Sequence, residues 1–327
     1  MMIDFFLSSK LWAVCGTAFL LLFPFFIPAG AEQFVLHLAT LILLWTMLCV
    51  SLNVIFGYAG QLSLAQGGMF GTGAYVAGIL AGQYGINFWW AFLAGGCAAG
   101  LLGLIIGIPS LRLRGPYFVI VTMGFNIILV AIVENLGGLT GGVTGLMGIP
   151  APSNIGNISF NSKIKLYYLI LILLFIFWIV AYRIKNSRMG ICLNAIKHDE
   201  DLCRSVGINT MWMKVQAFIV SSILAGLGGA LYGSFLGIIT PRDASFHIGF
   251  DALVFLIVGG IGTIPGTIIG PTIMVVISEL TQSVVQIGIL VNGLVLILLL
   301  IFMPKGLAGV FEHTKKIILL HSFKKNR

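Results

Sequence analysis

Residues 187–229, SRMGICLNAIKHDEDLCRSVGINTMWMKVQAFIVSSILAGLGG, decide how this chain folds. The first half is rich in charge and can form a helix, and the second half begins a long apolar run. Charge is scarce elsewhere, since charged residues make up only 9% of the 327 residues. The stretch therefore predicts a structured, charged segment at a membrane surface, followed by a helix that enters the bilayer.

The charged half predicts a short amphipathic helix over roughly residues 193–205. Ile196, Leu202 and Val206 would form its apolar face, and Gly207 would end it. The rim of that face would carry five charges, on Lys197, Asp199, Glu200, Asp201 and Arg204. Such a helix could dock into a groove of a soluble subunit, with the apolar face as the main anchor and rim charges such as Lys197 as weaker contributors.

The composition defines the class of protein. Hydrophobic residues make up 59% of the chain, and the mean hydropathy is +1.08, so a soluble fold could not bury its apolar surface. We therefore expect an all-α polytopic membrane protein. The formal net charge of +8 does not indicate a nucleic-acid partner, because the basic residues lie in loops between apolar runs and in the tail.

Apolar runs of crossing length predict about eight to ten transmembrane helices. The clear runs are 11–29, 34–56, 67–83, 88–109, 116–135, 164–182, 214–238 and 286–303. Residues 248–280 are ambiguous, because GGIGTIPGTIIGP places Pro265 among glycines. We expect the chain to break there, as either two crossings or a re-entrant pair.

Clusters of Lys and Arg give the orientation. They occur in the central loop (183–214), at Arg112 and Arg114, and in the tail (305–327), and all three clusters belong in the cytoplasm. We expect both termini to be cytoplasmic. Residues 1–33 resemble a secretory signal, but the run is long and contains prolines, so an uncleaved first span is favoured over a signal peptide. The main transmembrane domain would then be 34–304.

Glycine is the second organising feature. Glycines in steps of four, such as Gly229, Gly233 and Gly237, indicate close helix packing within one subunit, with dimerisation as the alternative. The segment 57–75, GYAGQLSLAQGGMFGTGAY, differs because polar side chains lie among its glycines. It is either an unwound stretch that lines a wet cavity or a plain polar turn between two spans.

Five motifs together resemble one family, the permease subunits of bacterial ABC importers for branched-chain amino acids. They are GYAGQLSLAQGGMFGTGAYVAGIL, RLRGPYFVIVTMGF, LTGGVTGLMGIP, AIKHDEDLCRSVGINTMWMKVQAFIVSSILAGLGGALYG and VGGIGTIPGTIIGP. The chain looks most like the second permease of the pair. The resemblance implies a heterodimer of two related permeases, two cytoplasmic ATPase subunits, a periplasmic binding protein and a small-molecule substrate.

Three groups of residues have expected roles. The resemblance implies the role of the first group, the charge count and glycine content indicate that of the second, and polarity indicates that of the third. The coupling helix that the ATPases grip would comprise Ala195, Lys197, Asp199, Glu200, Arg204, Val206 and Gly207. The external loop 137–152, with Gly141, Gly142 and Gly145, would meet the binding protein. The pathway for a neutral or zwitterionic solute would use uncharged polar side chains, namely Gln61, Ser63 and Gln66, with Asn53 on the preceding helix.

Two departures from the family pattern leave the solute open. Val143 and Thr144 follow the paired glycines of the external loop, where many relatives have a polar or acidic residue. Asp251 opens an apolar span, which the pattern does not predict. Related permeases carry urea or short amides with similar motifs, so those solutes remain alternatives.

Several kinds of chemistry have no motif here. The chain has no G-x-x-x-x-G-K-[ST] phosphate loop, no hydrolase motif and no histidine or cysteine pair at metal-ligand spacing, so we expect no enzyme activity, cofactor or metal. Two other classes of protein remain open, a stand-alone secondary carrier with inverted repeats and a membrane scaffold or sensor. Acidic residues are scarce within the apolar runs, which weighs against a proton-coupled carrier.

Overall fold

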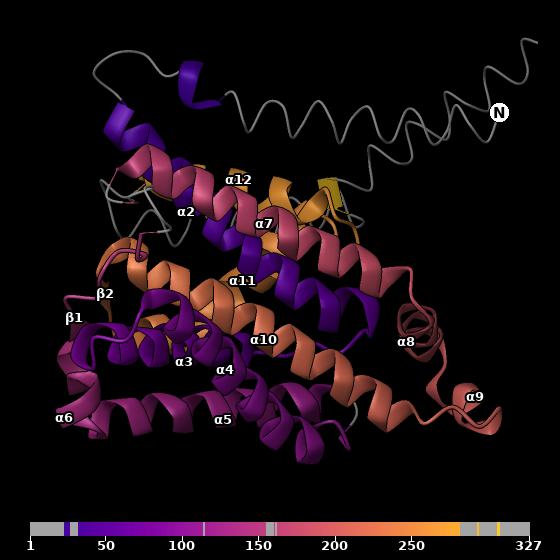
Figure 1. Ribbon diagram of the computed structural model, residues 1–327. Helices are drawn as coiled ribbons and strands as arrows, with labels where there is room; N and C mark the ends of the chain where they lie inside the picture. Colours follow the sequence, from indigo (N-terminus) through magenta and orange to yellow (C-terminus); the bar gives the residue numbers. More distant parts are fainter. Residues whose placement is uncertain are drawn as a thin grey trace, which may run out of the picture.

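The computed structural model describes residues 23–26, 32–113, 115–154, 160, 162–281, 293 and 306–307, and these are mainly helical (Figure 1). The longer helices are α2 (Glu32–Leu52), α4 (Phe88–Ser110), α5 (Pro116–Asn135), α7 (Lys163–Lys185) and α10 (Thr210–Leu236). The shorter α-helices are α3 (Gln66–Gly78), α6 (Gly137–Thr140), α8 (Arg188–His198), α9 (Glu200–Ser205), α11 (Phe246–Gly259) and α12 (Gly266–Thr281). Two π-helical turns, η2 (Asn53–Tyr58) and η3 (Ile79–Gln83), extend α2 and α3, and the 3-10 turns are η1 (Phe23–Phe26), η4 (Gly142–Thr144) and η5 (Pro241–Ala244).

These elements confirm the expected all-α, multi-pass membrane architecture. Within the described residues, five helices are long and apolar enough to cross a membrane: α2 with η2, α4, α5, α7 and α10. The predicted run 67–83 corresponds to α3 and η3. Most of the predicted run 11–29 and all but one residue of the run 286–303 lie outside the described residues, as do the greater parts of the N-terminal span 1–33 and the tail 305–327.

Helix α10 is at the centre of the fold. In Figure 1 it runs between α2 and α7 on one side and α3 and α4 on the other, and α5 lies at the outer edge. Glycines allow this packing, because a Cβ at Gly229 would collide with the carbonyl of Phe70, and one at Gly73 with the backbone of Gly226. The glycine stripes therefore pack helices within this subunit, as the sequence predicts.

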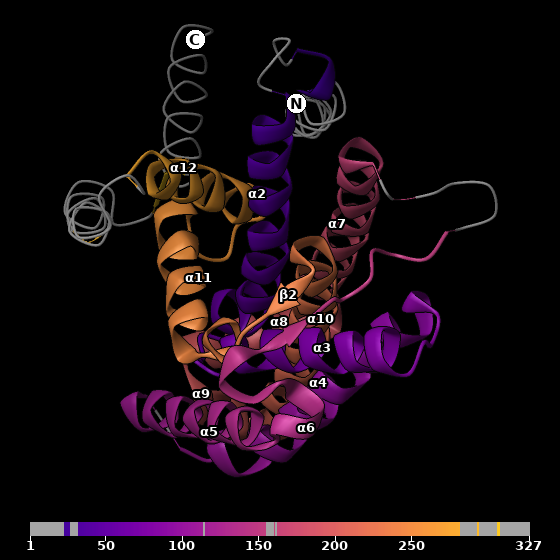
Figure 2. The same ribbon diagram turned by 90° about the vertical axis from the view of Figure 1, so that its left-hand side faces the viewer.

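The chain breaks where GGIGTIPGTIIGP predicts it. Helix α11 ends at Gly259, and α12 begins at Gly266 after a short turn (Figure 2). The two helices have 14 and 16 residues, about 21 and 24 Å, so each is shorter than the roughly 30 Å hydrocarbon core. They pack against each other through Gly259 and Gly270, whose neighbours are backbone atoms of the other helix.

The external loop is also structured. Strand β1 (Leu146–Met147) pairs antiparallel with β2 (Ile238–Ile239), which directly follows α10. The loop between α5 and α7 is thereby fixed to the end of α10 opposite the charged helices α8 and α9, at the other end of the molecule in Figure 1.

Candidate functional site

The extended segment between η2 and α3, residues 59–65, is held by side chains of another helix. The Leu64 amide donates to the Thr122 hydroxyl at 3.3 Å, and the Leu64 carbonyl accepts from Asn126 Nδ2 at 3.1 Å. Both side chains belong to α5. Backbone outside a helix or barrel is tolerated at membrane depth only where protein or a wet cavity satisfies it, so α5 makes this segment, here called the unwound segment, possible.

The inner end of the unwound segment lies well within the bundle. Gln66 Nε2 donates to Ser221 Oγ at 2.8 Å, and that hydroxyl donates to the Ser51 carbonyl at 2.6 Å. Ser221 lies eleven residues after Thr210, the first residue of α10, which corresponds to roughly 16 Å along the helix. The chain therefore leaves α2 and η2, with a last helix-type bond from the Gly60 amide to the Phe56 carbonyl. It then runs back into the bundle outside any helix and starts α3 at that depth.

Two amide oxygens at this depth lack donors. Gln66 Oε1 and Asn126 Oδ1 are buried, and neither has a hydrogen-bond partner among the described residues. Their orientations follow from their other bonds, since the Ser221 hydroxyl already donates to Ser51 and the Leu64 carbonyl can only accept. A buried acceptor without a donor costs about 1–3 kcal/mol. The inner end of the unwound segment therefore presents two fixed acceptors to any group that brings N–H or O–H donors.

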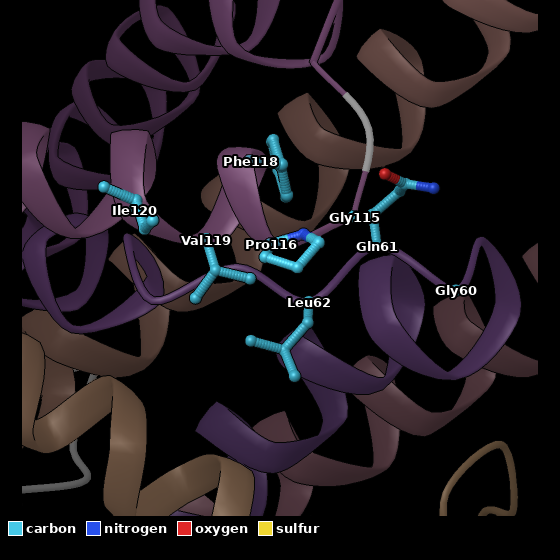
Figure 3. A pocket seen from close by; sticks show the side chains of 8 residues that line it. All are labelled: Gly60, Gln61, Leu62, Gly115, Pro116, Phe118, Val119 and Ile120. Carbon is cyan, nitrogen blue, oxygen red and sulfur yellow. The ribbon is translucent and has the colours of Figure 1, made fainter.

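An open pocket of about 480 Å³ lies beside the outer end of the unwound segment (Figure 3). In this view Gln61 and Leu62 point to opposite sides of the extended backbone, and Val119 lies on the α5 side. The lining is mainly apolar and comprises Gly60, Gln61, Leu62, Gly115, Pro116, Phe118, Val119 and Ile120. The polar residues Thr122 and Asn126 follow the pocket residues along α5.

The predicted pathway residues have different environments. Gln61 lines the pocket, whereas Ser63 is buried and accepts from the Ala65 amide at 3.2 Å. Asn53 is not beside the unwound segment's inner end. Its Oδ1 accepts from the Gly262 amide at 2.8 Å, so it joins η2 to the turn between α11 and α12. Sequence reasoning missed Thr122 and Asn126, although both are polar residues in the mainly apolar stretch 116–134.

The prediction of one helix over residues 193–205 is wrong, because the chain forms two helices here. Helix α8 ends at His198, and Asp199 starts α9 as its N-cap, accepting from the Leu202 amide at 2.9 Å. Asp199 is thus a capping residue and not a rim charge. Gly207 does end the second helix as expected, with a φ of 85° and an Ile208 amide that donates to the Cys203 carbonyl.

The apolar face predicted for this segment is divided between the interior and the surface. Ile196, on α8, is buried. Leu202, on α9, is 63% exposed, and Val206, just after α9, is 69% exposed. Ile191, which sequence reasoning did not single out, is 67% exposed on α8, and Ala195 is also exposed. Helices α8 and α9 therefore keep one apolar set inside and present another set outward.

Glu200 belongs to an internal ion pair and not to an exposed rim. Its carboxylate accepts from Lys214 Nζ at 2.8 Å, from Arg204 at 2.7 Å and from the Thr210 hydroxyl at 3.1 Å. The Lys214 side chain is almost fully buried. Burial alone would raise the pKa of Glu200, but the bonds and charge of Lys214, with Thr210 and Arg204, hold that pKa below its ordinary value. The pair fastens α9 to the first turns of α10.

Lys197 also differs from the prediction that it is a charge on the rim of a docking helix. Its ammonium donates to the Gly57 carbonyl at 3.0 Å, although the residue belongs to α8.

The external loop has the glycine conformations that the sequence predicts. Gly141 and Gly142 have φ values of 76° and 59°, and Val143 between them and Gly145 is 75% exposed. In the part of the chain that the structure describes, no group of His, Cys, Asp or Glu side chains has a metal-binding arrangement.

Comparison with known proteins identifies relatives across most of the chain. Residues 34–304 match the family described as branched-chain amino acid transport system / permease component. The high-affinity branched-chain amino acid transport system permease protein LivM of Escherichia coli (strain K12) is 30% identical over 322 residues, covering 92% of this chain and 75% of that protein. LivH of Salmonella typhimurium (strain LT2), a permease protein of the same description, is 27% identical over 291 residues, covering 81% and 91%. No solved structure shows a significant match.

Proposed function

Because this chain belongs to the family of branched-chain amino acid transport system permeases, we propose that it is the membrane-spanning subunit of an ABC importer for branched-chain amino acids. A periplasmic binding protein delivers the solute, and two separate cytoplasmic ATPase subunits supply the energy. The partner across the pathway is a related permease. Similarity to both LivM and LivH, two permease proteins with the same description, supports that pairing.

One observation carries the proposal: the unwound segment joins an apolar pocket to two buried acceptors that lack donors. The branched aliphatic side chain of such an amino acid fits the pocket formed by Leu62, Phe118, Val119 and Ile120. The ammonium group of the amino acid can donate to the amide oxygens of Gln66 and Asn126. An importer gains nothing from tight binding inside the membrane, and these neutral acceptors are weak ligands. In this proposal Gln61, Ser63 and Gln66 line the pathway, and Asn53 fixes η2 against the turn between α11 and α12.

The cytoplasmic helices suit a docking role. Leu202 and Val206 offer exposed apolar anchors, and the Glu200–Lys214 pair connects their helix to α10, which reaches Gln66 through Ser221. The external loop with Gly141, Gly142 and Gly145 lies at the opposite end and carries the exposed Val143, which suits contact with the binding protein. The proposal includes a location in the inner membrane with both termini in the cytoplasm.

Uptake by the reconstituted complex tests the proposal. Proteoliposomes with both permeases, the ATPases and the binding protein should accumulate labelled leucine, isoleucine and valine with ATP, and should not accumulate labelled urea or acetamide. Preference for urea or acetamide would assign the chain to a permease for amides. Uptake that proceeds without the ATPases, driven by an ion gradient, would instead indicate a secondary carrier.

A pull-down tests the docking role. Val206→Asp should recover about tenfold less ATPase than the wild type, because a carboxylate would replace an apolar anchor in a desolvated contact. Val206→Thr keeps the shape of the side chain and is the matched control. Equal recovery with Val206→Asp would mean that the ATPases bind elsewhere.

A further inference from the structure

The two breaks in the helices touch each other. A Cβ at Gly57, near the end of η2, would lie 3.0 Å from the amide nitrogen of Gly262, in the turn between α11 and α12. Asn53 spans the same junction, since its Oδ1 accepts from Gly262 and its Nδ2 donates to the Thr263 carbonyl at 3.4 Å. The outer end of the unwound segment is therefore built against the second break.

Each break carries a lysine on one of its carbonyls. Lys185, in the last turn of α7, donates to the Gly262 carbonyl at 3.2 Å, and Lys197 donates to the Gly57 carbonyl at 3.0 Å. Gly57 lies in the last turn of η2, and the final carbonyls of a helix have no partner within that helix and carry its negative dipole end, so the Lys197 ammonium stabilises that end. The two lysines come from different elements, however, and only Lys197 belongs to the helices that carry the exposed docking residues.

Lys197 contacts the unwound segment with its stem as well as its head. A Cβ at Gly60 would lie 2.8 Å from Lys197 Cγ, so the aliphatic stem lies against Gly60 while the ammonium binds Gly57. Gly60 and the following Gln61 line the pocket on their other side. One side chain of α8 thus touches the stretch that forms the mouth of the proposed pathway.

We propose that Lys197 is a positioning residue that transmits movement of the ATPase-docking helices to the unwound segment. In this way it sets the shape of the pathway's mouth at the outer end of that segment. The inference rests on the proposed function. It replaces the sequence-based view of Lys197 as a weak rim charge: displacement of α8 displaces Gly57–Gly60 directly, because the ammonium–carbonyl bond and the stem contact move with the helix. The ligand contacts themselves remain those of the pocket.

The test uses the complete complex in proteoliposomes and measures leucine uptake per ATP hydrolysed. Lys197→Met keeps the stem but removes the donor, and it should lower that ratio by about tenfold, because a hydrogen bond from a charged donor biases a two-state element by at least this factor. Lys197→Arg should restore most of the ratio. Arg188→Met is the matched control, since Arg188 is an exposed cation on the same helix, and it should behave as the wild type.

A second measurement separates coupling from a structural role. In a protein without its native cysteines, Gln61→Cys should change its rate of reaction with a small water-soluble thiol reagent when ATP is added, and Lys197→Met should abolish that change. A wild-type uptake ratio with Lys197→Met, or loss of ATPase binding in its pull-down, would overturn the proposal. Failure of the wild-type complex to transport branched-chain amino acids would instead overturn the proposed function. The thiol measurement would still test the role of Lys197 in that case, because it does not depend on the solute.

Discussion

The two breaks are held in different ways. The turn between α11 and α12 is stabilised partly by its own side chain, since the Thr263 hydroxyl donates to the Gly260 carbonyl at 2.8 Å and accepts from the Gly266 amide at 3.1 Å. Asn53 and Lys185, from other elements, add hydrogen bonds to Gly262. The unwound segment relies on other helices, since its Leu64 amide and carbonyl are both bound by α5 side chains. We expect the turn that carries its own bracing side chain to be the more rigid break, and the segment that depends on α5 to change when that helix moves.

The surroundings of the breaks agree with this difference. Around the second break, glycines place backbone against backbone, as at Gly259 and Gly270, where no side chain can yield. Around the unwound segment lie a pocket, two acceptors without donors and the long side chain of Lys197. From this comparison we expect the second break to be a fixed joint and the first to be the adaptable part of the transporter.

The largest expected effect comes from filling the fixed joint. In Gly270→Val, the new Cβ would collide with the Phe255 carbonyl and lie 3.0 Å from the Gly259 amide nitrogen, so α11 and α12 would have to separate. We expect a loss of more than about 4 kcal/mol, seen as loss of monodisperse protein in size-exclusion chromatography. Gly124→Val on α5 is the control, because no atom lies within 4 Å of its Cβ position. A well-folded Gly270→Val protein would show that the joint is adaptable too.

Much of this difference between the two breaks could not be predicted from the sequence. The positions of the spans, the break at Pro265 and the glycine packing follow from local pattern, because hydrophobic length and backbone contact need no partner assignment. The roles of Lys197, Glu200 and Asn53 do not, since each depends on a partner far along the chain, such as Asn53 with Gly262. Charge and polarity indicated that these residues matter, but only tertiary structure shows what they bind.

The second prediction concerns the ion pair that fastens α9 to α10. Glu200→Gln leaves the buried Lys214 without a counter-charge and should cost about 3 kcal/mol at neutral pH. In the wild type the pKa of Glu200 is lowered in the folded state, so its contribution is complete above the unfolded value of about 4.3 and is lost as pH falls through the lower folded value.

Thermal unfolding of the two proteins between neutral and acidic pH measures this contribution. The wild type should lose its advantage over Glu200→Gln only in acid, and the two curves should converge there. Asp201→Asn is the control, since the Asp201 carboxylate is 70% exposed and lies 3.9 Å from Arg204. An advantage that persists unchanged in acid would mean that the carboxylate is not the source of the stability.

The third prediction concerns the dependence of the unwound segment on α5. Asn126→Leu removes the donor to the Leu64 carbonyl, and a buried acceptor left without a partner costs about 1–3 kcal/mol. Loss of the unpartnered Asn126 Oδ1 offsets part of that cost, so we expect a net destabilisation at the lower end of this range. Asn135→Leu is the matched control on the same helix, since Asn135 is exposed and bonds only the Ala131 carbonyl one turn before it. The unfolding midpoint should fall for Asn126→Leu alone, and equal midpoints would show that the segment holds itself in place.

The last prediction perturbs the protein least and asks where the adaptable region opens. Gln61 lines the pocket, whereas Ser63 and Gln66 are buried, so single cysteines at these positions should differ in reaction rate with a small water-soluble thiol reagent. The background lacks the five native cysteines (Cys15, Cys49, Cys97, Cys192 and Cys203). Gln61→Cys should react at least about tenfold faster than the other two in the resting protein, because a buried thiol reacts only after local opening.

Substrate with ATP should then narrow the difference, since passage of a solute through the unwound segment requires its inner end to become accessible. Cys192, partly exposed on α8 outside the candidate membrane spans, reports whether the reagent is active when it is the only cysteine present. If all three engineered cysteines stay unreactive in every state of the cycle, the polar cluster is packing between helices and the pathway lies elsewhere. If Ser63→Cys reacts fully at rest, the unwound segment is open without the ATPases, and its contrast with the fixed joint is larger than the static contacts indicate.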